Sequence, residues 1–250
     1  MTRVACITVT RGDRPEFLQH CRYLMEEQLA PANHVVVSGD PGPGNYDMGP
    51  KLRMGMEWAR ENGYDLALVI EDDDWYGPDY VMESAEHWEK AGRPLAIGIM
   101  AAKTYHIGRD EYMAWGFPQI STLANMGFNL ARMDELFWSD VALDDGRLSC
   151  PRAAWSQDAY FGLMHDVHCR LFTYQYVGIK HGIAGCMLQH RKTVAESIKD
   201  PDHRILRALV DPVSYKFYQV LKHSGKVNTV AEGVVSIREK VGQDTWGKPA

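Results

Sequence analysis

The sequence lacks the patterns of several specialised protein classes. Its five cysteines are widely scattered and form no Cys-x-x-Cys pair, which argues against a zinc knuckle and against a disulfide framework. No apolar run approaches the roughly 20 residues that a membrane-spanning helix needs, and the first residues show no secretory signal pattern. We therefore expect a cytoplasmic protein without a membrane span.

Two common enzyme motifs are missing as well. No Gly-x-Ser-x-Gly elbow is present, which removes the commonest α/β-hydrolase interpretation. Gly42 and Gly44 precede Lys51, but their spacing is not that of a phosphate-binding P-loop. The chain also has no internal repeat, so a repeat architecture is not expected.

The composition is that of an ordinary globular protein. Of 250 residues, 45% are hydrophobic and 24% are charged, which argues against disorder and allows a substantial core. The net charge of −6 is uneven: from Cys186 onward 11 Lys and Arg stand against 7 Asp and Glu, so that part carries +4 and residues 1–185 carry −10. Such a split is typical of an acidic metal site beside a basic arm for a polyanion, or simply of two solvated faces.

Apolar strands and amphipathic helices alternate in the first 70 residues. Val4–Thr10, His34–Ser38 and Asp65–Ile70 have the short, apolar and mostly β-branched pattern of buried strands. A helix beginning at Pro15 and a second over Lys51–Asn62 are expected between them. Alternation of this kind predicts a parallel α/β sheet.

Polar residues follow each of these strands. Thr10 to Arg14 follows the first, Gly39 and Asp40 end the second, and Glu71 to Asp74 follows the third. Ligands of parallel sheets gather beyond the carboxyl ends of strands, so these clusters predict a binding site. Four consecutive carboxylates repel one another unless a cation neutralises them, which favours Mg²⁺ or Mn²⁺ over the alternative of an acidic helix-capping turn.

The second half of the chain has a less regular pattern. Strands are expected over Leu95–Ala101 and Leu171–Ile179, and a helix is expected from about Arg132. Ser156 is a suitable N-cap for another helix, and residues from about 200 to 223 form a further helical region.

The segment Val69–Tyr80, with its acidic run followed closely by Pro78, resembles the DxD segment of GT-A fold, family 2-like glycosyltransferases. Further landmarks follow in the family's order over about residues 3–190. The resemblance implies an α/β, Rossmann-like GT-A fold with a mixed, mainly parallel sheet flanked by helices. It also implies a domain over 1–190, with a nucleotide-binding part of about 1–100 and an acceptor part of about 101–190, and we expect residues 191–250 to form a basic, mainly helical C-terminal extension.

Site residues are assigned from this resemblance together with the positions above. Those expected to bind the nucleotide-sugar follow strands or face the nucleotide: Thr10, Arg11, Arg14, Asp40, Lys51 and Asp72. Those expected to hold the metal are Asp73 and the late histidine His181. The resemblance makes Asp158 the catalytic base and places Gly127 on the acceptor side. Trp115 and Trp155 are candidates for stacking on a sugar or base, although either could be a structural tryptophan.

Three positions depart from the family pattern or leave it open. Gln157 stands where an acid is usual before the catalytic Asp158, and Glu71 replaces the first Asp of DxD. His190 competes with His181 for the metal, but Arg191 beside it disfavours a cation, so His181 is preferred.

The resemblance implies an inverting, metal-dependent glycosyltransferase that uses a nucleotide-sugar, by family habit a UDP-sugar, with Mn²⁺ or Mg²⁺ as cofactor. The acceptor hydroxyl is open, and a glycan or hydroxymethylated bases of DNA are both considered. The basic segment after Cys186 favours a nucleic acid, while the net charge of −6 disfavours one. The alternatives are a non-catalytic module that binds nucleotide-sugars or nucleic acid, which Gln157 keeps open, and a nucleotidyltransferase.

Overall fold

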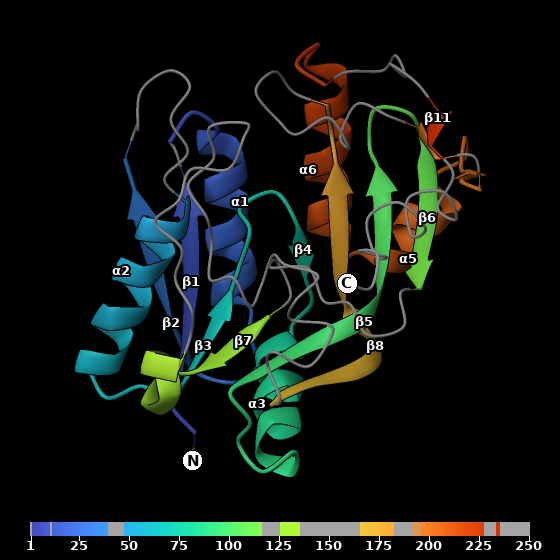
Figure 1. The fold of residues 1–250 in the computed structure, drawn as a ribbon. Coiled ribbons are helices and arrows are strands. Elements are labelled where there is room, and N and C mark those ends of the chain that lie inside the picture. The colour runs from blue at the N-terminus through green and yellow to red at the C-terminus, as the bar shows by residue number, and fades with distance from the viewer. Residues whose placement is uncertain are drawn as a thin grey trace, which may run out of the picture.

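A computed structural model describes residues 2–10, 12–39, 48–116, 126–135, 166–182, 193–194, 196–227 and 234–235. These residues form a nine-stranded mixed sheet with helices on both faces, and a separate pair of short strands (Figure 1). Along the main path the strand order is β10-β6-β5-β7-β3-β1-β2, and β8 joins β5 and β4 beside it.

The N-terminal half of the sheet is parallel. Strand β1 (Val4–Thr10) lies between β2 (Ala32–Ser38) and β3 (Leu66–Val69) and pairs with both in parallel. All seven residues of β1 pair with β2, from Val4–Ala32 to Thr10–Ser38. The carboxyl ends of these three strands therefore lie at one edge of the sheet, which is the upper edge in Figure 1.

Two helices cover opposite faces of these strands. Helix α1 (Pro15–Glu26) packs Phe17 and Cys21 into the core that contains Val4 and Cys6, whereas helix α2 (Met48–Glu61) packs into the core that contains the alternate β1 residues Ala5 and Ile7. Successive side chains of a strand point to opposite faces, so the two helices lie on the two sides of the sheet.

The second half adds longer and mostly antiparallel pairings. Strand β5 (Ala96–His106) is central, because it pairs antiparallel with β6 (Glu111–Gly116) and β7 (Gly127–Asn129) and parallel with β8 (Val167–Lys180). The remaining elements here are β4 (Trp75–Tyr76), α3 (Tyr80–Lys90) and the 3₁₀ helix η2 (Leu130–Glu135). The pairing of β4 with β8 brings the end of β8 close to the acidic run.

The C-terminal elements are β9 (Thr193–Val194), β10 (Ile198–Lys199), α5 (Arg204–Leu209), α6 (Pro212–His223) and β11 (Val234–Val235). The two helices among them pack onto the same core as α1. Leu206, Tyr218 and Leu221 are buried in the core that α1 lines. Asp211 caps α6 by accepting hydrogen bonds from the backbone N–H groups of Val213 and Ser214, and its other carboxylate oxygen accepts one from Trp75 Nε1 at 3.0 Å.

Most of the expected elements are confirmed. The strand predicted over Val4–Thr10 has those bounds, the helix predicted at Pro15 begins there, and the helical region near 200–223 contains α5 and α6. The mixed sheet flanked by helices is confirmed, and parallel ladders hold more of its paired residues than antiparallel ones. The prediction of an α-helix from about Arg132 is wrong for the described residues, which form a 3₁₀ helix up to Glu135.

That segment is the 3₁₀ helix η2. The Asn129 side chain caps its start by accepting a hydrogen bond from the backbone N–H of Ala131 at 3.1 Å. Arg132, with φ −112° and ψ 16°, lies outside the α-helical region, so the described residues do not continue as an α-helix. The helix expected after Ser156 lies outside the described residues.

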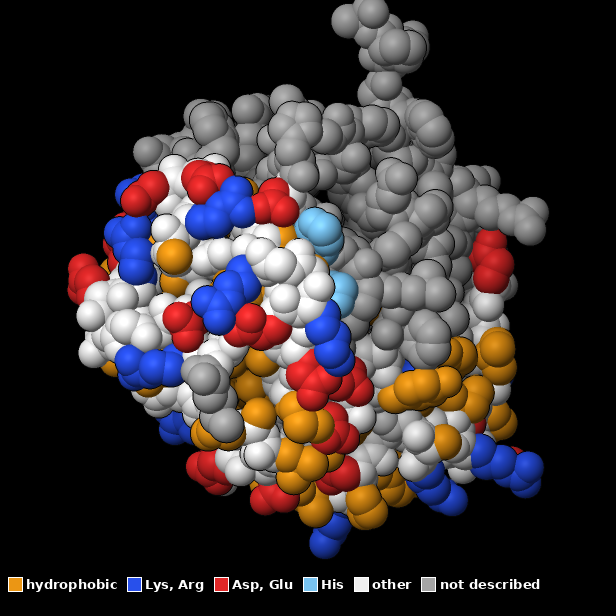
Figure 2. All heavy atoms as spheres, turned by 90° about the horizontal axis from the view of Figure 1, so that it is seen from below, with side chains coloured by type: hydrophobic (Ala, Val, Ile, Leu, Met, Phe, Trp, Pro, Cys, Tyr) orange, Lys and Arg blue, Asp and Glu red, His pale blue; other side chains and the backbone are white. Residues whose placement is uncertain are grey.

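The described surface is mixed in character. Viewed from below, side chains of both charge signs lie side by side, and hydrophobic side chains gather toward one edge (Figure 2). No helix among the described ranges combines the length and apolar character that crossing a bilayer requires.

Helix α6 contacts α1 through a buried histidine. His20 is 6% exposed, stacks on the Phe217 ring with 4.2 Å between centroids, and its Nε2 lies 3.0 Å from Ser214 Oγ. Burial lowers the pKa of His20 from 6.5 to about 4, although nearby Asp211 opposes that change. The folded protein therefore keeps His20 neutral at a pH where the unfolded chain protonates it.

We expect this histidine to make stability depend on pH. Its contribution is complete above pH 6.5 and is lost as the pH falls toward 4, because the unfolded state then binds more protons. Chemical unfolding of wild type and His20→Gln at about pH 7, 5.5 and 4.5 measures it. The free energy of unfolding of wild type should fall relative to that of the variant by up to about 1.4 kcal/mol per pH unit within this window. A difference between the two proteins that is constant with pH would contradict the assignment.

Candidate functional site

The candidate site lies beyond the carboxyl ends of β1 and β3. Thr10 is the last residue of β1, and Glu71 to Asp74 form the turn between β3 and β4. The backbone N–H of Ile70 donates to the Ile7 carbonyl at 2.9 Å, so the β1–β3 pairing continues up to the turn. The polar residues that follow the strands are thereby brought together, as expected for a parallel sheet.

Asp72 is held by residues from the first strand and the loop after it. One carboxylate oxygen accepts a hydrogen bond from Thr10 Oγ1 at 2.9 Å, and the other accepts one from an Arg14 guanidinium nitrogen, Nη2, at 2.6 Å. Asp72 is 2% exposed. Burial raises its pKa, and the adjacent Arg14 partly opposes that rise.

Asp73, Arg14 and His181 form a compact triangle. Asp73 Oδ2 lies 2.8 Å from Arg14 Nη1 and 2.9 Å from His181 Nε2, and the two nitrogens are 3.2 Å apart. Burial lowers the pKa of His181, an effect that the neighbouring Asp73 opposes. Burial acts against the charge of Arg14 too, but Asp73 and Asp72 outweigh it and raise the pKa of the guanidinium.

Asp74 connects the acidic turn to strand β8 through hydrogen bonds. Its two carboxylate oxygens accept hydrogen bonds from the Tyr176 hydroxyl and from the backbone N–H of Ile179, each at 2.7 Å. Both donors belong to β8, so Asp74 fixes that strand against the acidic turn. Burial is the main cause of the raised pKa of Asp74.

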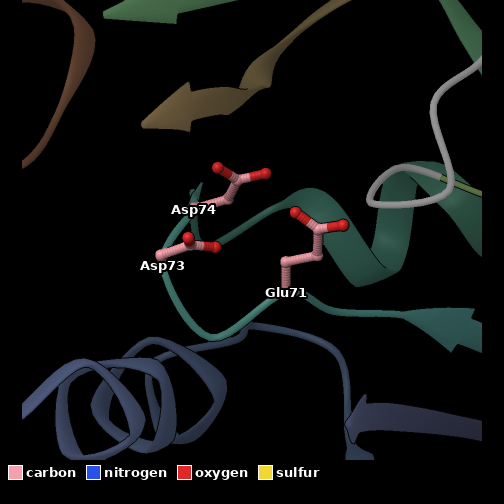
Figure 3. Close-up of side chains that lie close together, drawn as sticks. All are labelled: Glu71, Asp73 and Asp74. Atoms are coloured by element: carbon pink, nitrogen blue, oxygen red, sulfur yellow. The ribbon is translucent and has the colours of Figure 1, made fainter. Parts of the chain in front are cut away.

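Glu71, Asp73 and Asp74 point their carboxylates toward one another (Figure 3). One oxygen of each lies within 4.8 Å of the others. Burial, together with the charges of Asp74 and Asp73, raises the pKa of Glu71. Three crowded carboxylates with oxygen donors fit a hard divalent cation such as Mn²⁺ or Mg²⁺, which would relieve their repulsion.

Lys51 also reaches this edge of the sheet. Its side chain is buried, and Nζ donates to the Gly39 carbonyl at 2.5 Å and lies 3.5 Å from the Thr10 carbonyl. The ammonium group therefore lies between the carboxyl ends of β1 and β2. Together with Thr10, Arg14, Asp72, Asp73 and His181, it makes six sequence-predicted residues that the structure places at this edge.

Two other predicted residues lie elsewhere in the sheet. Gly127 begins β7, and a Cβ atom there would lie 2.7 Å from Leu68 Cδ2 and 2.9 Å from Ile97 Cγ1, so this glycine allows close packing between β3 and β5. Trp115 is on β6 and pairs with Ala102 of β5, so β5 and β7 separate it from β3. Acceptor-side roles for both residues stay predictions.

The remaining predicted residues lie outside the described ranges. They are Arg11, Asp40, Trp155, Asp158 and the competing metal candidate His190. The roles of these five residues stay sequence-based predictions.

The sequence analysis did not assign a role to Tyr176 or a metal-binding role to Glu71. Glu71 could have been found, because it is the first residue of the acidic run and lies at the strand end. Tyr176 gives no local signal, because its contact with Asp74 depends on the long-range pairing of β4 with β8.

A second group of polar side chains, Asp211, Ser214 and His20, resembles a catalytic triad in composition only. Ser214 Oγ donates to Asp211 at 2.5 Å, so the carboxylate contacts the serine in place of orienting the histidine. Ser214 is also fully buried, which prevents it from reaching a substrate. This group joins α6 to α1.

No protein-family model matches the chain, and no curated protein matches its sequence. Among solved structures, the chain is similar to S. aureus TarS in complex with UDP-GlcNAc, with a TM-score of 0.47 and 12% identity over 72% of this chain and 59% of that one. The complex of TarS with UDP has a TM-score of 0.49 and 11% identity over 71% and 60%.

A further similar structure is mannose-1-phosphate geranyltransferase from Thermus thermophilus, with a TM-score of 0.38 and 12% identity over 72% of this chain and 74% of that one. The chain matches about three fifths of the length of the TarS structures. The likeness concerns the fold alone, so the chemistry of the site rests on the residues of this chain.

We expect Asp73 and Asp74 to differ when each is replaced by asparagine. Asp73→Asn should lower the affinity for Mn²⁺ by at least roughly 10- to 100-fold, since loss of a direct charged ligand costs no less than loss of the outer-shell partners whose removal has that effect. Asp74→Asn should lower the free energy of unfolding by about 1–2 kcal/mol, because a charged acceptor of two buried hydrogen bonds is lost.

Isothermal titration with Mn²⁺ and chemical unfolding of both variants distinguish the two roles. Asp134→Asn, which removes a carboxylate charge from an exposed position outside the turn, is the control for both measurements. An unchanged Mn²⁺ affinity in Asp73→Asn would show that this residue does not hold the cation.

Proposed function

We propose that the protein is an inverting, metal-dependent glycosyltransferase that moves a sugar from a nucleotide-sugar, a UDP-sugar in the first instance, to an acceptor hydroxyl. The observation that carries this proposal is the convergence of Arg14, Asp72, Asp73 and His181 beyond the parallel strands. The sequence resemblance to GT-A fold, family 2-like glycosyltransferases supports it. An acidic turn and two cations at one sheet edge suit a diphosphate together with a divalent ion.

The donor would bind through residues already in place at this edge. Asp72 is positioned to accept a hydrogen bond from ribose or to contact the ion, and Lys51 and Arg14 bring positive charge to the diphosphate. Asp73 is the central candidate for holding a divalent cation, together with Glu71 and Asp74 of the acidic turn or with His181 beside it. When bound, that cation would supply electrostatic stabilisation of the leaving diphosphate.

The transfer step requires a base on the acceptor side, and we assign Asp158 to it. The acceptor oxygen attacks the anomeric carbon from the face opposite the diphosphate, the bond from that carbon to the diphosphate oxygen breaks, and Asp158 takes the hydroxyl proton. Attack from the opposite face inverts the anomeric configuration. The products are the glycosylated acceptor and a nucleoside diphosphate.

Three lysines of the C-terminal segment form ion pairs within the protein, which bears on hydroxymethylated DNA as an acceptor. Lys222 Nζ lies 2.6 Å from Asp110, and Lys199 and Lys226 pair with Glu111 and Glu16. These lysines already have intramolecular partners. Phosphate contacts of the kind that dominate DNA binding would have to replace those ion pairs.

Donor hydrolysis tests the proposal without knowledge of the acceptor. Purified protein is incubated with a panel of nucleotide-sugars that includes UDP-GlcNAc, each with Mn²⁺, with Mg²⁺ or with EDTA, and release of the nucleoside diphosphate is measured. We expect release from at least one UDP-sugar that depends on the divalent ion. Binding of a nucleotide-sugar with no turnover would identify a binding module, and release of pyrophosphate from a nucleoside triphosphate would identify a nucleotidyltransferase.

Asp158→Asn tests the proposed base. The variant should bind the donor as tightly as wild type and lose transfer by about 10²- to 10⁴-fold, the usual contribution of general-base catalysis. Asp134→Asn, which makes the same chemical change at an exposed position paired with Arg60, is the matched control. Turnover of Asp158→Asn near the wild-type rate would place the base elsewhere or indicate a retaining mechanism.

A further inference from the structure

Arg14 lies between Asp73 and His181, the two residues that the sequence resemblance assigns to the metal. Its Nη1 atom lies 2.8 Å from Asp73 Oδ2 and 3.2 Å from His181 Nε2, while Nη2 lies 2.6 Å from Asp72. The side chain is 23% exposed and passes over the Phe17 ring at 5.5 Å. The guanidinium is thus the cation that contacts Asp72 and Asp73, while the charge of Lys180 acts on Glu71 and Asp74.

The triangle of Arg14, Asp73 and His181 cannot satisfy all three of its contacts at once. If His181 Nε2 is unprotonated, it accepts a hydrogen bond from Arg14 Nη1, and its 2.9 Å contact with Asp73 then joins two acceptors. If Nε2 carries a proton, it donates to Asp73, and its 3.2 Å contact with Arg14 then joins two donors. Either tautomer leaves one unfavourable contact.

A divalent cation would remove this conflict only if the guanidinium leaves. An unprotonated imidazole nitrogen has a single lone pair in the ring plane. That lone pair can either accept a hydrogen bond from Arg14 or bind a metal ion, but not both. A second feature favours movement, since Arg14 Nε is buried and has no hydrogen-bond partner among the described residues. A buried unpaired donor makes the arrangement less stable than one in which Nε is satisfied.

We infer that Arg14 and a divalent cation compete for Asp73 and His181, and that a nucleoside diphosphate favours the cation by attracting the guanidinium to its own oxygens. Arg14 is then the counter-ion of the acidic turn in the free protein and a diphosphate ligand in the complex. The second half of this inference rests on the proposed function, and the first half does not.

Competition makes cation and diphosphate binding mutually dependent. The cation alone must displace a guanidinium from two carboxylates and a histidine, whereas with diphosphate present the guanidinium has another anionic partner. Each ligand therefore increases the affinity for the other by the same factor, as linkage requires. Removal of the guanidinium should abolish most of this dependence.

Titration of Mn²⁺ alone into wild type, Arg14→Gln and Arg14→Lys tests the competition. We expect Arg14→Gln to bind Mn²⁺ roughly tenfold more tightly than wild type, corresponding to a loss of about 1.4 kcal/mol of competing interaction. Arg14→Lys should fall between them, because one compact ammonium group cannot bridge Asp72 and Asp73 as the planar guanidinium does. Arg22→Gln removes the same charge from an exposed position on helix α1 and should resemble wild type.

Repeating the titrations with UDP present tests the coupling. UDP should increase the Mn²⁺ affinity of wild type and have a clearly smaller effect on Arg14→Gln. Circular dichroism and thermal unfolding show whether Arg14→Gln is folded. If it is not, Arg14→Lys is compared with wild type in its place.

Two outcomes overturn the inference: a Mn²⁺ affinity in Arg14→Gln that is no higher than in wild type, or no measurable Mn²⁺ binding by either protein. If UDP raised the Mn²⁺ affinity of wild type and Arg14→Gln equally, the coupling between UDP and the cation would be wrong, and the competition between Arg14 and the cation would still stand. If Arg14→Gln binds Mn²⁺ more tightly but neither protein binds UDP or any other nucleotide, the competition stands and the proposed donor is wrong.

Discussion

Neutralisation of Asp72 and Asp73, two carboxylates that are almost fully buried, is the constraint on which the arrangement of the site depends. A buried anion without a partner is costly, so a cation must lie beside these side chains. Arg14 meets this need from the loop between β1 and α1, at 2.6 Å from one carboxylate and 2.8 Å from the other. Its position follows from Pro15, the next residue, which begins α1 and fixes where the loop ends.

Aromatic residues of α1 and α6 pack against this ion cluster. The Phe17 ring lies under Arg14 and 4.8 Å from the His181 ring, and it contacts Phe217 of α6 edge-on at 5.8 Å. Helix α6 is in turn fixed to the acidic side by its cap, since Asp211 bonds Trp75 just after the acidic turn. The C-terminal helices are therefore part of the packing that holds the site, even though their sequence carries none of the residues assigned to it.

The charge of Arg14 bears both on the stability of the free protein and on the proposed binding of a divalent ion. A permanent cation on the acidic turn keeps the free protein stable, and it also occupies the atoms that a divalent ion would use. Under the competition proposed above, movement of Arg14 would resolve this conflict, because its charge would pass from protein carboxylates to the phosphates of a nucleoside diphosphate. Arg14 beside Asp72 and Asp73 would then stabilise the free protein, and Arg14 on the diphosphate would complete the proposed donor site.

The sequence by itself determined the alternation of strands and helices up to residue 70, and from it the edge at which polar residues gather. This was possible because β1, β3, α1 and α2 bury their apolar faces locally, and the strand and helix periods are visible in the chain. Only the tertiary structure decided the partners within the cluster. The role of Asp74 depends on Tyr176, 102 residues further along the chain, and His181 reaches Asp73 because β8 pairs with β4 and β5. Contacts that arise from long-range strand pairing leave no periodic signal in sequence, so neither the structural task of Asp74 nor the position of Arg14 between Asp73 and His181 could be predicted from it.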